Sequence, residues 1–241
     1  MSIIGLLITA LLPASAVVCI AVKKRVPVYA LVAVFFVTAV SLFPVLALQH
    51  FVHTFFDTIV LKQSEAVRLF FNSFITAALT EEGVKAACFG LTVALLSKKR
   101  SYPTQEKNDR AKTLDRLEGR NRQARYLSFY HRIILAVFFG FIFSGFENIS
   151  YSLRYPTVQF LRVFTAAVLH GILGCFYASM TYVKAMRKAT LIFITAVILH
   201  GLYNFFISLG GGFILPATAV LGIACLYVRW LFSSIYFQPL K

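Results

Sequence analysis

Two adjacent carboxylates and a lysine interrupt a long apolar stretch of the sequence, in the segment 79–90 (LTEEGVKAACFG). Glu81 and Lys85 are four residues apart, so on a helix they share a face and can form an ion pair. A carboxylate in a low-dielectric site takes up a proton more readily than in water, which suits it to act as a general base for water. Of the two acids, Glu81 and Glu82, one can therefore accept a proton while Lys85 neutralises the other.

Three further motifs place polar side chains within apolar stretches. They are ENISY (147–151), HGILG (170–174) and HGLYN (200–204). Neutral imidazoles can bind a metal or polarise a carbonyl group, and an asparagine amide can donate to a developing oxyanion. The candidate site residues in these motifs are Glu147, Asn148, Tyr151, His170, His200 and Asn204.

The cost of burying charged groups indicates that these side chains meet at one site. A charged residue at the centre of a membrane helix costs roughly 2.5–3.5 kcal/mol, so four facing lipid would cost on the order of 10 kcal/mol. With a rise of about 1.5 Å per residue, Glu81, Glu82, His170 and His200 fall roughly 13–20 Å below the outer face. We therefore expect polar groups on four helices to face one another and to hydrolyse a substrate with activated water. The sequence contains no HExxH motif, and no Ser–His–Asp set can be read from it.

The composition is that of an integral membrane protein. Of the 241 residues, 59% are hydrophobic and 14% are charged, and the mean hydropathy is +0.77. Soluble domains are roughly half apolar and about a quarter charged. The formal charge of +15 lies largely in loops between apolar runs, where the positive-inside rule places basic residues on the cytoplasmic side. We therefore expect these loops to contact anionic lipid, and we expect no nucleic acid as a partner.

The apolar runs predict an all-α, polytopic membrane helix bundle that forms a single integral membrane domain over 1–241. About seven spans are expected, at 3–22, 28–48, 69–96, 133–151, 161–183, 190–209 and 213–235, with a polar connection at 49–68. Although Ala14-Ser15-Ala16 resembles a signal-peptide cleavage site, we favour a retained first helix because no basic residue precedes the apolar run.

The basic segments predict the orientation of the bundle. Segment 97–132 carries eleven Lys/Arg against four Asp/Glu, so we expect it to be a basic cytoplasmic loop. With the N-terminus outside and the C-terminus cytoplasmic, every strongly basic loop faces the cytoplasm.

The four motifs, in their order along the chain, resemble those of the PrsW family of bacterial intramembrane proteases, which is related to the CAAX prenyl endopeptidases. The resemblance rests on EEGVK at Glu81–Lys85, GFIFSGFENISY at Gly140–Tyr151, HGILG at His170–Gly174 and HGLYN at His200–Asn204. Gly145 departs from the family pattern, which has a further acid there. The motif-bearing part runs from about Leu69 to Leu209.

The resemblance implies a multi-pass protease of the inner (cytoplasmic) membrane. Its substrate would be a membrane-anchored protein, cleaved near the extracytoplasmic side. An anti-sigma factor is the implied example, and its cleavage would start a stress response by regulated intramembrane proteolysis.

The resemblance also implies roles for the site residues, under two mechanisms. Under the metal mechanism, His170, His200 and Glu147 hold zinc, which lowers the pKa of bound water. Under the glutamate mechanism, Glu81 and His170 activate water, while His200 and Asn204 stabilise the oxyanion. In both, a glutamate of EEGVK is the general base, and the sequence leaves both mechanisms open. The supporting residues are Lys85, Glu147, Asn148 and Tyr151.

Two other function classes compete with proteolysis. Intramembrane Glu, Lys and His also mark the proton relays of ion-coupled carriers, but the chain shows no internal repeat and no pair of broken helices in corresponding halves. A non-catalytic membrane scaffold or immunity protein could keep the same fold. Substitution of Glu81 distinguishes a scaffold from a protease, because a scaffold keeps its biological output without that carboxylate.

Overall fold

The structure, a computed structural model, describes residues 3–60, 62–97, 127–154 and 164–236. These residues are almost entirely helical, and none of them lies in a strand. The prediction of an all-α protein is therefore confirmed. Among the described residues, four helical stretches are long and apolar enough to cross a membrane: Val28–Phe56, Phe129–Ser150, Met186–Leu209 and Ile214–Ser234.

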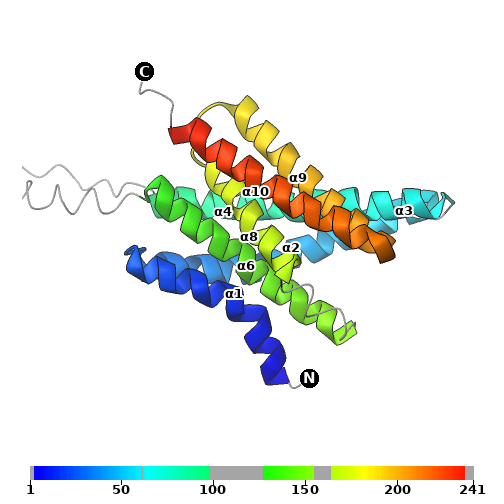
Figure 1. Ribbon diagram of the computed structural model, residues 1–241, viewed down its shortest axis with the longest axis horizontal. Helices are drawn as coiled ribbons and strands as arrows, with labels where there is room; N and C mark the ends of the chain where they lie inside the picture. The colour runs from blue at the N-terminus through cyan, green and yellow to red at the C-terminus, as the bar shows by residue number, and fades with distance from the viewer. Residues whose placement is uncertain (1–2, 61, 98–126, 155–163, 237–241) are drawn as a thin grey trace, which may run out of the picture.

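The helices lie close to the expected spans, and Figure 1 shows them packed side by side as an elongated bundle. Their bounds are α1 (Ile3–Lys23), α2 (Val28–Val60), α3 (Glu65–Phe71), the π-helix η1 (Asn72–Leu79), α4 (Thr80–Ser97), α6 (Phe129–Arg154), α8 (Ala166–Met180), α9 (Met186–Leu209), the 3-10 turn η2 (Gly211–Phe213) and α10 (Ile214–Tyr236). Gly210 ends α9 with φ of 69°, a left-handed conformation that favours glycine. Most of the expected loop 97–132 lies outside the described residues.

The expected polar connection at 49–68 is wrong, because α2 continues through most of it. This helix has 33 residues and ends at Val60, so it is about 50 Å long. Between Gln49 and Val60 the sequence contains no glycine or proline to end a helix. Pro44 lies inside α2, and Gln49 is part of the same helix.

Helices α6 and α8 pack with their backbones almost in contact. A Cβ atom added at Gly140 of α6 would lie 2.1 Å from the backbone oxygen of His170, and one at Gly174 of α8 would lie 2.3 Å from that of Ala136. Only glycine permits so close an approach of two helices. The contact fixes the part of α8 that carries His170. Around it lie the fully buried core residues Leu135, Phe139, Leu169, Leu173 and Phe176.

Large apolar side chains cover the outward faces of α2 and α10. Phe43 of α2 is 72% exposed, and Leu226 of α10 is 68% exposed. Soluble monomers rarely expose wide contiguous apolar surfaces. Lipid is the solvent that suits these faces.

We expect Gly140→Ala to lower the free energy of unfolding by about 1–3 kcal/mol, because the added methyl group forces α6 away from α8. The measurement is thermal unfolding of the purified protein in detergent. Gly222→Ala in α10 is the matched control, since a Cβ atom there meets nothing within 4 Å. If the two variants unfold at the same temperature, the close contact does not limit stability.

Candidate active site

The two adjacent glutamates lie in the first turn of α4, immediately after the π-helix. η1 has eight residues and continues α3 directly into α4. π-helical turns are rare in proteins, and those that occur often lie at functional sites. At the junction, the Thr80 hydroxyl donates to the backbone oxygen of Thr76 at 2.6 Å. The first turn of α4 then carries both carboxylates into the interior, where Glu81 is 5% exposed and Glu82 is fully buried.

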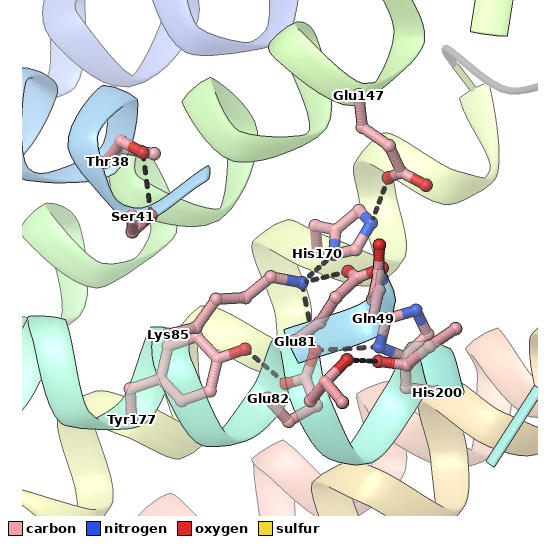
Figure 2. Close-up of polar contacts among 12 residues, drawn as sticks. Thr38, Ser41, Gln49, Glu81, Glu82, Lys85, Glu147, His170, Tyr177 and His200 are labelled. Carbon is pink, nitrogen blue, oxygen red and sulfur yellow. Dashed lines mark hydrogen bonds and ion pairs between the residues drawn. The ribbon is translucent and has the colours of Figure 1, made fainter. Parts of the chain in front are cut away.

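Lys85 places a buried ammonium group at the centre of the site. Its Nζ lies 2.8 Å from Oε2 of Glu81, 3.1 Å from Oε1 of Glu82 and 3.1 Å from Nδ1 of His170. The ring of Phe143 covers the ammonium at 3.9 Å from its centroid. Figure 2 shows the lysine side chain directed between the two glutamates and His170. A buried charge is stable only with such partners.

The contacts of His170 determine where its proton lies. An ammonium group has no lone pair, so Nδ1 of His170 accepts from Lys85. Nε2 therefore carries the hydrogen and donates to Oε2 of Glu147 at 2.9 Å. Glu147 thus orients the imidazole from the side remote from Lys85 (Figure 2). The lone pair of Nδ1 faces the cluster.

Glu82 is held by three donors from three helices. Its Oε1 accepts from Lys85 and from Nδ1 of His200, the latter at 2.8 Å. Its Oε2 accepts from the hydroxyl of Tyr177 on α8. A carboxylate with several hydrogen-bond donors and a nearby ammonium is stabilised in its ionised form. The geometry makes Glu82 the fixed anion of the cluster.

Glu81 has fewer partners and lies nearer to the surface of the site. Besides Lys85, its carboxylate accepts from Nε2 of Gln49, 3.1 Å from Oε1. Gln49 is half-buried and comes from α2. Helices α2, α4, α6, α8 and α9 all supply polar groups to the site.

The structure brings six of the predicted site residues together: Glu81, Glu82, Lys85, Glu147, His170 and His200. Asn148 is buried and donates to the Ser144 hydroxyl at 3.4 Å. Asn204 is half-buried one turn beyond His200, and within the described part of the chain no hydrogen bond joins it to the cluster. The side chain of Tyr151 lies outside the described residues.

Two site residues were missed by the sequence analysis, Gln49 and Tyr177. Tyr177 lies seven residues after His170, so it shares a helical face with that histidine. This spacing could have drawn attention to it. Gln49 was assigned to a connection between spans, and the absence of a helix breaker after it was the overlooked signal.

Four residues of the cluster could hold a metal ion. Glu81, Glu82, His170 and His200 each offer one ligand atom, and these atoms lie within 4.8 Å of one another. Two imidazoles and two carboxylates are suitable zinc ligands in type and number. Glu147 is not in this group, because it contacts the other ring nitrogen of His170. A ligating histidine usually donates its second nitrogen to a carboxylate in this way, so the donor set fits a divalent ion. In this structure the Lys85 ammonium donates to three of these four residues, Glu81, Glu82 and His170.

A family model described as PrsW family intramembrane metalloprotease matches residues 26–231. The chain belongs to the PrsW family. It is therefore a peptidase of the membrane, and its substrate is a membrane protein, as predicted. The match also extends the expected family region to α2 and most of α10, and so includes Gln49. Neither a curated protein nor a solved structure matches the chain.

We expect Tyr177→Phe to destabilise this PrsW-family protein by about 1.5–3 kcal/mol, because it removes a donor to a buried carboxylate. Thermal unfolding in detergent measures the loss. Tyr227→Phe is the control, since that ring stacks on Phe176 of the core, away from the glutamates. Equal effects of the two substitutions would mean that the contact with Glu82 adds nothing special.

Proposed function

We propose that the chain cuts a membrane-anchored protein near the extracytoplasmic face, with water activated by a carboxylate of the buried cluster. The observation that carries the proposal is the convergence of two glutamates and two histidines within 4.8 Å, inside a family of intramembrane proteases. An anti-sigma factor is an example of the proposed substrate class. The proposed location is the inner membrane of a bacterium.

The proposed topology has seven passes, with the N-terminus outside and the C-terminus in the cytoplasm. The helix order supports it, because the described residues form seven helical segments: α1, α2, the continuous α3–η1–α4, α6, α8, α9 and α10. In Figure 1 the end of α1, the start of α6 and the end of α10 lie on one side of the bundle, and α3 lies at the opposite end. The first three ends adjoin basic segments or the C-terminus, which the positive-inside rule assigns to the cytoplasm, where anionic lipid is their proposed partner.

The proposed roles of the two glutamates follow from their contacts. Glu82 keeps its charge, because Lys85, His200 and Tyr177 all donate to it. Glu81 has a single amide donor besides Lys85. It is thus the carboxylate better placed to take a proton from water. We assign the general base to Glu81 and the orientation of the cluster to Glu82.

The reaction then proceeds as an ordinary peptide hydrolysis. Glu81 removes a proton from water while the water oxygen bonds to the carbonyl carbon of the scissile peptide. We assign the oxyanion that forms to the face of α9 that carries His200 and Asn204. The C–N bond breaks as the proton passes from Glu81 to the leaving nitrogen. When no metal ion is bound, His170 helps to hold the Lys85 ammonium between the two glutamates.

The proposed cofactor is a single zinc ion, which Glu82, His170 and His200 would hold, so that Glu81 stays available as the base. When bound, zinc supplies Lewis acidity that lowers the pKa of water and polarises a carbonyl group. The charge of the site supports a cation, because three carboxylates lie close together in an interior of low dielectric. Glu147 would orient His170 as it does now.

The proteolytic function predicts that Glu81→Gln abolishes new protein N-termini in cell membranes. Membranes from cells with the wild-type chain and with the variant, at matched protein levels, are compared by mass spectrometry of N-terminal peptides. Lys188→Gln also replaces a charged group by an amide, at an exposed position in the first turn of α9, and this variant is the control. Identical profiles for wild type and Glu81→Gln under several stresses would contradict the proposal and favour a carrier or scaffold.

The metal assignment predicts about one zinc per chain in protein purified in detergent without chelators. His200→Ala should lose most of this zinc, because it removes one of the proposed ligands. His53→Ala is the control, since His53 lies outside the cluster. Metal analysis of the three proteins gives the answer. Full cleavage by protein shown to be metal-free would overturn the zinc assignment and leave the roles of Glu81 and Glu82 standing.

A further inference from the structure

The catalytic cluster is enclosed, so a substrate must reach it from a neighbouring surface. Glu82, Lys85, His170 and His200 are all buried. Among the buried residues of the site Glu81 is the most exposed, and its partner Gln49 of α2 is half-buried. The path of a substrate is therefore to be sought along α2.

A pocket of about 240 Å³ lies at the end of α2 that is remote from the basic turn 23–25. The rings of Phe56 and Phe71 form its apolar part, with centroids 5.2 Å apart. Its polar part comes from His53, Glu65 and Arg68. The pocket thus combines an aromatic wall with groups of both charge signs, which suits an apolar side chain whose backbone stays polar.

Two elements run from this pocket directly to Glu81. Gln49, His53, Phe56 and Val60 are four, three and four residues apart, so they lie on one face of α2. On the other side, Asn72 lines the pocket and begins the π-helix that leads into Glu81. From Gln49 to Phe56 the helix rises about 10 Å. An extended peptide covers that distance in about three residues.

We propose that this pocket binds a bulky apolar side chain of the substrate, about three residues from the bond that is cut. The occupant is an extended segment of a membrane-anchored protein where it leaves the bilayer. The inference rests on the proposed function, and it adds to that function a determinant of which bond is cut. Continuity with the cluster through Gln49 and η1 favours this occupant over a free small molecule.

The test uses as its substrate the membrane protein whose new N-terminus depends on Glu81, purified together with the chain in detergent. Phe56→Ala should raise KM about tenfold or more and leave kcat within about twofold, because it removes contact with a part of the substrate that does not react. Phe43→Ala is the matched control, since Phe43 lies on the same helix and faces outward. Its KM and kcat should equal those of the wild type.

A second measurement ties the effect to the proposed contact. The substrate residue that lies about three positions from the cut is changed to alanine and tested with wild type and with Phe56→Ala. If both side chains meet in the pocket, the two changes together raise KM little more than either alone. Phe56→Leu keeps an apolar wall, should raise KM by a smaller factor, and replaces Phe56→Ala in this comparison where the alanine variant does not fold.

Three results would overturn the inference or its basis. An unchanged KM, or a fall in kcat alone, would mean that Phe56 acts through the helix and not on the substrate. If the enzyme and substrate changes raise KM additively, the two side chains do not contact each other. The absence of any Glu81-dependent terminus would instead contradict the proposed function itself, together with this inference.

Discussion

The ammonium group of Lys85 is the constraint on which the arrangement of this bundle depends. In a low-dielectric interior, one unpaired charge costs several kcal/mol, so Lys85 requires anions and the anions require Lys85. Its three polar partners come from α4 itself and from α8. Each of those partners has a further partner on another helix: Gln49 on α2, Glu147 on α6 and His200 on α9. One buried cation therefore fixes the relation of five helices.

The packing of the helices makes this network possible. His170 can reach Lys85 and Glu147 together because α8 lies against α6 at glycine contacts, where a single Cβ atom would not fit. Phe143 of α6 closes the same space with its ring over the ammonium. At Gly201, next to His200, an added Cβ atom would lie 2.4 Å from the ring of Phe74 in η1, so α9 packs closely against the π-helix. Apolar packing and polar pairing therefore specify the same arrangement, as expected of a sequence with one preferred fold.

The sequence could predict the centre of the site because hydrocarbon offers no other partner to Glu81, Glu82, Lys85, His170 and His200. Depth along each span placed them at one level. Gln49 was harder to predict, because it lies just beyond the apolar run that marks the second span, although no glycine or proline ends the helix there. Tyr177 was hidden for another reason. A tyrosine in an apolar run is usual in a core, and only its position two turns from His170 distinguishes it. Composition and the apolar runs were enough to predict the helical class, whereas the partner of each histidine nitrogen could be identified only from the structure.

The position of Lys85 also limits how this site can hold a metal ion. A divalent ion held by Glu82 and His170 would need lone pairs that the ammonium now uses. The ammonium and the ion cannot both contact these atoms, because like charges so close together repel strongly in a buried site. The lysine side chain is long and flexible, so its ammonium can leave while its backbone stays in α4. Without the ion, Lys85 keeps two carboxylates from facing each other unpaired. With the ion, Glu147 and Tyr177 still hold His170 and Glu82 from behind, so the ligands keep their orientation in both states.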